Sequence, residues 1–283
     1  MQLDGQVAII TGAGRGIGRA IALAYAREGA RLALVARTLS ELEETASQAE
    51  ALGAATCVIP ADISDQGQVD EMVRQTLEHF PTIDILVNNA GVLGPIGPLQ
   101  DNDVSEFMRT FQVNVFGTFL CCRAVLPVML QKNRGKIINV TSGAPFTEAA
   151  PIRWPISGWC YEVAYLSSKA AMDSLTELLS YQVADKNIQV NAMIPIGPSK
   201  MSEEASRHRL GLEIGSLPLN PTYPVSDDPT QRSADLSLFL ASEASDGLSG
   251  RLFMVFDDFS SLTPRIPEIM ASDAYTLRRV ELE

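Results

Sequence analysis

Short apolar runs recur along the chain, and each is separated from the next by a stretch whose apolar residues have helical spacing. The runs cover residues 7–11, 32–36, 56–60, 83–88, 136–141, 188–194 and 252–256. Most are apolar throughout, which is typical of parallel strands buried on both faces. Parallel strands joined by right-handed helical crossovers form an open, doubly wound sheet. The pattern therefore predicts an α/β fold with one mostly parallel, seven-stranded sheet.

The intervening helices are predicted at about residues 17–29, 40–52, 69–80, 104–131, 161–184 and 230–241. A chain of 283 residues fits a single large domain, which we place at 1–258, followed by a tail at 259–283. Two long loops, 145–160 and 196–229, break the alternation. Loops of this length in compact domains often bind ligands, so we expect both at the carboxyl ends of strands.

The charge of the chain limits its partners. The net charge is −12, which repels nucleic acid and anionic lipid, so we expect neither nucleic acid nor a membrane as a partner. We also expect no membrane-spanning stretch and no secretory leader. The histidines, His79 and His208, are far apart, and the cysteines lack C-x-x-C spacing, so no metal site is predicted. Reduced thiols favour a cytoplasmic location.

A glycine-rich turn, Thr11-Gly12-Ala13-Gly14-Arg15-Gly16-Ile17-Gly18, follows the first predicted strand and opens the first helix. This is the context that a dinucleotide site requires, in a Rossmann-like fold. Gly12 would form the tight turn, Gly16 would let the pyrophosphate approach, and Gly18 would let the helix pack on the sheet. The alternative is a strand–helix turn that binds no ligand.

The end of the second strand bears on which cofactor binds. An acidic residue there would contact the ribose 2′-hydroxyl of NAD, but this chain has Ala36, Arg37 and Thr38. Arg37, with Arg15 from the glycine turn, could fork onto a 2′-phosphate, which favours NADP(H). The alternative is that one or both arginines are solvated surface charges.

Tyr165 and Lys169 are four residues apart on a predicted helix and therefore share one face. An ammonium group beside a phenol favours the phenolate and lowers the tyrosine pKa, so Tyr165 is a candidate general acid. The alternative is a half-buried core aromatic. Tyr161 lies on the same face but is too far from Lys169 for direct contact, and we expect it to be a pocket wall.

In order, these motifs resemble the short-chain dehydrogenase/reductase family over roughly residues 4–256. The matching elements are Thr-Gly-x-x-x-Gly-x-Gly, the segment Asn88-Asn89-Ala90-Gly91, Asn114, Ser142 and Tyr165-x-x-x-Lys169. The resemblance implies cofactor contacts from Gly12, Arg15, Gly16, Ile17, Gly18, Arg37, Thr38, Asp62, Ile63, Asn89, Ala90, Gly91, Tyr165, Lys169, Pro195 and Ser199.

The resemblance also implies roles for individual residues. Ser142 would hydrogen-bond the substrate carbonyl, and Lys169 would bind the nicotinamide ribose. Asn114 would lie at a local helix distortion and hold, through its carbonyl, a water that contacts the lysine; the alternative is a buried polar residue that satisfies backbone groups. Asp62 would contact the adenine ring, and the alternative is an N-cap for the third helix.

The chain departs from the family pattern in three places. About ten extra residues lie between Ser142 and Tyr165, and they include Trp154 and Trp159, which either line an apolar substrate pocket or fasten the loop. After the sixth strand, the usual Pro-Gly and threonine are replaced by Pro195-Ile196-Gly197-Pro198-Ser199, where Ser199 is the candidate donor to the nicotinamide. The end of the last strand is also altered, to Asp257-Asp258.

Together these features predict an NADPH-dependent reductase of ketones or aldehydes, with Asn114, Ser142, Tyr165 and Lys169 as catalytic residues. The expected partner is a small-molecule carbonyl or alcohol, and the resemblance implies a homodimer or homotetramer paired through the long helices. One alternative is an NADP⁺-dependent alcohol dehydrogenase that works oxidatively. Another is a sensor or scaffold that binds NADP(H) without turnover.

Overall fold

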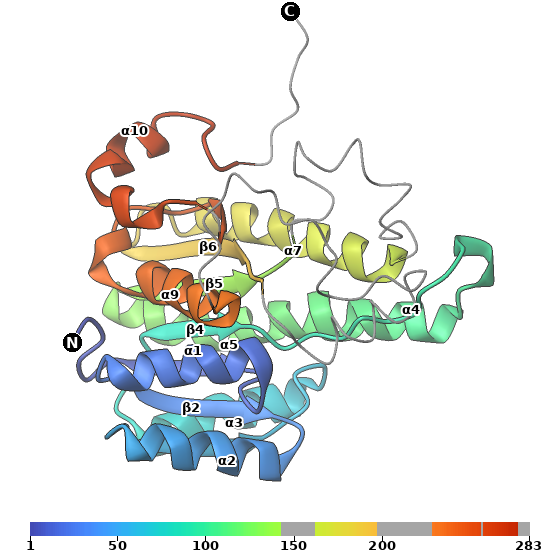
Figure 1. Cartoon of the computed structure of the whole chain (residues 1–283), viewed down its shortest axis with the longest axis horizontal. Coiled ribbons are helices and arrows are strands. Elements are labelled where there is room, and N and C mark those ends of the chain that lie inside the picture. Colours follow the sequence, from blue (N-terminus) through green and yellow to red (C-terminus); the bar gives the residue numbers. More distant parts are fainter. Residues whose placement is uncertain (143–161, 197–227, 256, 277–283) are drawn as a thin grey trace, which may run out of the picture.

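The computed structural model describes residues 1–142, 162–196, 228–255 and 257–276 (Figure 1). One seven-stranded sheet has the order β3-β2-β1-β4-β5-β6-β7, and every neighbouring pair is parallel. The predicted α/β fold is therefore confirmed. The strands are β1 Val7–Thr11, β2 Arg31–Ala36, β3 Thr56–Pro60, β4 Ile85–Asn88, β5 Gly135–Val140, β6 Ile188–Ile194 and β7 Leu252–Met254.

Helices cover both faces of the sheet (Figure 1). Their bounds are α1 Gly16–Arg27, α2 Leu39–Ala51, α3 Gln66–His79, α4 Val104–Phe111, α5 Thr118–Lys132, α7 Val163–Gln182, α9 Pro229–Ala241 and α10 Ile266–Met270. Short 3₁₀ turns lie at Leu99–Asp101, Glu243–Ser245, Phe259–Ser261 and Thr263–Arg265.

The core has two layers because side chains alternate along each strand. In β1, Ala8 and Ile10 pack with α1, α2 and α9, whereas Ile9 packs with α3, α5 and the end of α7. The first layer contains one buried polar link: the Tyr25 hydroxyl on α1 lies 2.8 Å from Ser237 Oγ on α9. The strands β1, β4, β5 and β6 are buried along their whole length, as their apolar runs predict, whereas the edge strands β3 and β7 are partly exposed.

The long helix predicted at 104–131 is interrupted by a π-helical segment, η2 Gln112–Gly117, between α4 and α5. Asn114 lies in this segment, where the family resemblance places a helix distortion. A π-helical turn adds one residue to the helix and often marks a functional site. Within this segment Asn114 is fully buried.

We expected no stretch long and apolar enough to cross a membrane. That expectation is wrong, because the helical segment Val104–Lys132 has both the length and the apolar composition. Half of its most apolar window (50%) is buried inside the molecule. Cys121, Val125 and Met129 are fully buried in the layer formed with α3. The α5 part of the segment therefore packs against the sheet as a core helix.

The described part of the tail, up to residue 276, returns to the sheet edge. The rings of Phe259 and Phe239 are 5.8 Å apart, and those of Tyr275 and Phe253 are 4.8 Å apart. The Leu252 amide donates to the Tyr275 carbonyl at 2.8 Å. This part of the tail thus packs on α9 and β7.

Candidate functional site

The glycine turn has the backbone that its sequence predicts. Gly12 and Gly16 have φ angles of +67° and +54°, in the left-handed region that favours glycine. A Cβ atom on Gly18 would lie 2.2 Å from the carbonyl oxygen of Gly12, so the first turn of α1 packs directly against the loop. The close approach keeps the N–H groups at the start of α1 free of side-chain cover, which suits an anionic phosphate.

Hydrogen bonds join this turn to the segment that follows β4. Thr11 Oγ1 accepts from the amides of Asn89 (3.0 Å) and Ala90 (3.1 Å). The Asn89 side chain donates in turn to the carbonyls of Thr11 (3.0 Å) and Gly12 (3.2 Å). The structure thus brings the predicted residues Gly12, Gly16, Gly18, Asn89 and Ala90 together at the carboxyl ends of β1 and β4.

A second set of contacts, which the sequence analysis did not predict, supports the turn from α1 and α2. Arg19 donates to the Gly14 carbonyl from Nε (3.0 Å) and Nη2 (2.5 Å). The Thr45 hydroxyl is fully buried and lies 3.1 Å from the Ala13 carbonyl. These two side chains thus hold the carbonyls of the loop that precedes α1.

Positively charged side chains gather beyond the end of β2. Arg15 is half-exposed and lies 3.6 Å from Glu41 on α2. Arg37, which follows β2, is exposed, and its charge together with that of Arg109 on α4 acts on the nearby Asp62. Arg109 was not predicted as a member of this group, because α4 is far from Asp62 in the sequence and comes near it only in the folded protein.

Asp62 follows β3, and its carboxylate accepts from the amide (3.0 Å) and hydroxyl (2.6 Å) of Ser64. Burial acts to raise the pKa of Asp62, but the Ser64 hydrogen bonds and the nearby arginines together lower it below its usual value. The alternative that Asp62 caps the third helix is wrong. Asp65 is the N-cap of α3, since its side chain accepts from the Gln68 amide.

Helix α7 places Tyr165 and Lys169 on one face. The Lys169 ammonium lies 5.7 Å from the centre of the Tyr165 ring and donates to the Val140 carbonyl at 2.8 Å. Lys169 is buried, whereas Tyr165 is half-buried. Ser142, also half-buried, is two residues past Val140 at the end of β5. The carboxyl end of β5 is therefore in direct contact with Lys169.

Asn114 reaches the same place from the π-helical segment. Its Oδ1 accepts from the Val92 amide at 2.8 Å, and its Nδ2 donates to the Val92 carbonyl and to Ser168 Oγ, each at 2.9 Å. A Cβ atom on Gly91 would lie 3.2 Å from Asn114 Oδ1 and 3.6 Å from the Lys169 ammonium nitrogen, so only glycine leaves these groups undisturbed. The side chain of Asn114 satisfies backbone groups, as the alternative interpretation predicts.

The main-chain carbonyl of Asn114 accepts from the Thr118 hydroxyl at 2.7 Å. Pro195, which follows β6, is half-buried, and Ile196 beside it is joined to α9 by hydrogen bonds with Ser233 (2.9 and 2.6 Å). Trp154, Trp159, Tyr161 and Ser199 lie outside the described residues.

The family model described as "short chain dehydrogenase" matches residues 6–209. Sorbitol dehydrogenase of Cereibacter sphaeroides is 38% identical over 69% of this chain and 71% of its own. A solved structure of NAD⁺-bound xylitol dehydrogenase is 29% identical, with a TM-score of 0.75 over 90% of this chain and 98% of its own. A 7α-hydroxysteroid dehydrogenase in complex with NADH and 7-oxo glycochenodeoxycholic acid is 30% identical, with a TM-score of 0.77 over 90% and 94%.

Proposed function

The chain belongs to the short-chain dehydrogenase family and is thus an oxidoreductase of alcohols or carbonyls, and from that premise we propose that it is an NADPH-dependent reductase of ketones or aldehydes. One observation carries the proposal. Tyr165 is paired on α7 with the buried ammonium of Lys169, which lies 3.6 Å from the position of a Cβ on Gly91, in the segment whose Ala90 amide is bonded to Thr11. An acid and a dinucleotide cradle at one edge of the sheet are what carbonyl reduction requires.

The residues of the turn fit a dinucleotide. Gly12 and Gly18 have no side chain, so the loop and α1 can pack closely against their neighbours. The N–H groups at the start of α1 can then bind a phosphate. When bound, the reduced nicotinamide supplies a hydride to the carbonyl carbon. Arg37 and Arg15 would hold the 2′-phosphate, Asp62 the adenine ring, and Lys169 the nicotinamide ribose.

The protein's own groups would then manage the proton. Ser142 would donate a hydrogen bond to the substrate oxygen and hold it near Tyr165, whose hydroxyl would protonate that oxygen. The positive charge of Lys169 favours the phenolate that remains. Asn114, through its main-chain carbonyl, would hold a water from which Lys169 and then Tyr165 recover the proton.

Turnover on a panel of carbonyl compounds tests the proposal. NADPH oxidation is followed against aliphatic, aromatic and steroid ketones and aldehydes, and NADP⁺ reduction against the matching alcohols. Reduction of at least one carbonyl class supports the proposal, and turnover confined to alcohols supports the oxidative alternative. NADP(H) binding with no turnover in either direction would support a sensor or scaffold and contradict the proposal.

The cofactor preference is proposed from Arg37, which makes no ion pair among the described residues. The Arg37→Ala variant should bind NADPH about 10- to 100-fold more weakly, because a charge-assisted hydrogen bond contributes about 1.5–3 kcal/mol. Binding of NADH should change little, since NADH has no 2′-phosphate. Fluorescence titration with both cofactors measures the two dissociation constants.

Arg31→Ala is the matched control, because Arg31 is exposed at the opposite end of the same strand. That variant should bind both cofactors like the unaltered protein. Equal weakening of NADPH and NADH by Arg37→Ala would show that the arginine does not contact the 2′-phosphate. Both cofactors must be titrated, because the solved structures of two relatives contain NAD⁺ or NADH.

We also propose a homo-oligomer that pairs through the long helices. Large apolar side chains are exposed on η2, α5 and α7, among them Phe116 (41%), Phe119 (42%) and Leu178 (58%). Leu178→Glu should place a charge in this interface and lower the mass in solution toward the monomer value of 30.6 kDa. Multi-angle light scattering measures the mass. Leu52→Glu, at an exposed apolar site (42%) beyond α2, is the control and should leave the mass unchanged.

A further inference from the structure

A carboxyl group is buried one helical turn beyond Lys169. Asp173 is only 4% exposed, and neither of its carboxylate oxygens has a hydrogen-bond partner among the described residues. Burying a carboxylate without partners is costly, so such a group in a native protein needs an explanation. The position gives one, because residues four apart on a helix are neighbours on one face.

Lys169 needs a negative charge nearby. Its side chain is 3% exposed, and its ammonium donates to the Val140 carbonyl and lies 3.5 Å from the Met172 sulfur. Neither of those partners carries a formal charge. A buried ammonium without a counter-charge tends to lose its proton, yet the proposed reaction uses Lys169 as a cation. Within the described part of the chain, Asp173 is the carboxyl group that acts electrostatically on it.

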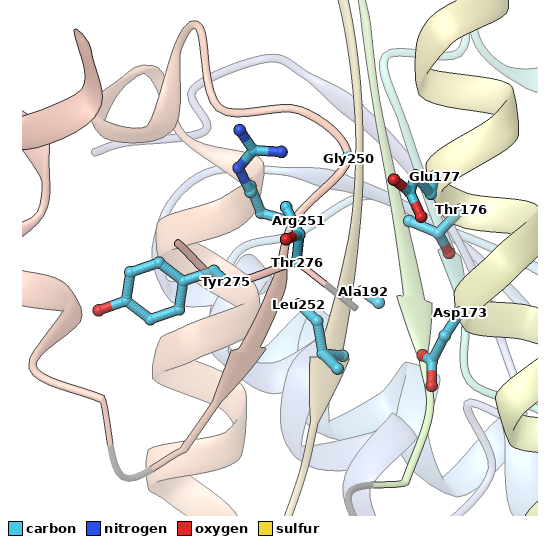
Figure 2. Close-up of a pocket in the computed structure, with 9 residues that line it drawn as sticks. All are labelled: Asp173, Thr176, Glu177, Ala192, Gly250, Arg251, Leu252, Tyr275 and Thr276. Atoms are coloured by element: carbon cyan, nitrogen blue, oxygen red, sulfur yellow. The ribbon is translucent and has the colours of Figure 1, made fainter. Parts of the chain in front are cut away.

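The surroundings of Asp173 allow it to be ionised. A cavity of about 10 Å³ lies beside it, lined by Thr176 and Glu177 from α7 and by Ala192 from β6, which is room for about one water molecule. Figure 2 shows Asp173 on the strand-facing side of α7, with the guanidinium group of Arg251 directed away from it. That guanidinium donates to the carbonyls of Ile269 and Ser272.

We propose that Asp173 is a positioning residue whose carboxylate keeps Lys169 protonated, so that the lysine can act on Tyr165 and on the cofactor ribose. The inference rests on the proposed function and deepens it. Tyr165 and Asn114 face the lysine, while the cavity beside Asp173 is also lined by Glu177, Arg251 and Tyr275. Glu177 and Tyr275 are partly exposed, so solvent weakens their influence.

The pKa values of the pair agree with this geometry. Burial lowers the pKa of Lys169 to about 8, and the negative charge of Asp173 opposes that fall. Burial raises the pKa of Asp173 to about 7, against the lowering effects of the Thr141 hydroxyl and Lys169. The Thr141 hydroxyl is close enough to Asp173 to lower its pKa. It donates to the Met193 carbonyl at 3.5 Å, however, and the carboxylate oxygens of Asp173 have no well-formed hydrogen bond among the described residues.

The Asp173→Asn variant tests the proposal, because it removes the charge with almost no change in volume. Lysines labelled with ¹³C at Cε are titrated by NMR, and the Lys169 signal is identified by its loss in Lys169→Met. In Asp173→Asn the Lys169 titration should move to lower pH by about one unit, as expected for loss of a nearby opposite charge. Glu177→Gln, a control at the half-exposed side of the same cavity, should leave the titration in place.

A purely structural role for Asp173 would give a different result. Because the folded-state pKa of Asp173 is raised, folding takes up a proton between the usual carboxyl pKa and about 7, and stability falls as pH rises through that window. Asp173→Asn should remove this fall, so its melting temperature should rise most above neutral pH. A change in stability with an unmoved Lys169 titration would overturn the proposal.

The NMR measurement needs no substrate, so it separates this inference from the proposed function. A shifted Lys169 titration in a protein that reduces no carbonyl would leave the charge relationship in place and contradict the reductase. If Asp173→Asn does not fold, Asp173→Ser provides the same test. In an active enzyme, the pH dependence of kcat should move together with the lysine titration, and a pH profile that stays fixed would contradict the proposal.

Discussion

Replacement of Tyr165 by phenylalanine is expected to lower kcat by at least about a thousandfold, within the range for loss of a positioned general acid. The substitution removes only the hydroxyl that would protonate the substrate oxygen. The ring and its neighbour Lys169, 5.7 Å from the ring centre, can stay in place. The affinity for NADPH should therefore change by no more than about threefold, since the interaction lost belongs to the transition state.

Tyr181→Phe is the control for this experiment. Tyr181 lies on the same helix, is 57% exposed, and bonds through its hydroxyl to Glu177 at 2.8 Å. Its loss should leave turnover unchanged. Single-turnover kinetics with pre-bound NADPH separate the chemical step from binding. Normal activity in Tyr165→Phe would remove the tyrosine from the mechanism, and a large loss of NADPH affinity would show that the hydroxyl serves mainly to bind the cofactor.

Gly18→Ala is expected to have the second largest effect, on both stability and cofactor binding. The added methyl carbon would lie 2.2 Å from the Gly12 carbonyl oxygen and 2.5 Å from Asn89 Nδ2. The Gly12 backbone cannot move aside without breaking the bonds that join the loop to the segment after β4. Overpacking of this kind typically costs about 1–3 kcal/mol, and the displaced loop should lose most of its affinity for NADP(H).

Gly67→Ala provides the comparison. Gly67 lies in the first turn of α3, and its added Cβ would come no closer than 3.3 Å to another described atom, Asp65 Oδ1. Alanine has a higher helix propensity than glycine, and the contact is with a side chain and not with main chain, so this variant should lose far less stability than Gly18→Ala. Thermal melts with and without NADP⁺ measure both effects. Equal behaviour of the two variants would show that the loop tolerates a side chain at position 18.

The strands could be predicted because their signal is local. Each apolar run needs cover on both faces, and the order of runs and helices leaves few ways to provide it. Boundaries were less certain. The run predicted to start at residue 83 begins its strand at Ile85, although the main chain of Asp84 already bonds to Val7 and Lys136 and its carboxylate accepts from the Val7 amide. The amino-acid sequence alone does not predict a contact between residues that are 77 positions apart.

The same distinction applies to the candidate site. The glycine turn and the Tyr165–Lys169 pair are visible because their spacing along the chain is what the geometry uses. Arg19, Arg109 and Asp173 were missed, since each acquires its neighbours only when helices pack. Asp62 shows the limit for capping: two aspartates precede α3, and which of them caps it depends on backbone geometry at the helix start.

The contact between Leu252 and Tyr275 has a consequence for how copies of the protein can meet. β7 is one of the two edge strands of the sheet, and an unprotected edge strand can pair with a strand of another molecule. Here a backbone donor of that strand is already bound by the returning tail, and the strand itself is only three residues long. Edge-to-edge aggregation of copies of the protein through β7 is therefore disfavoured.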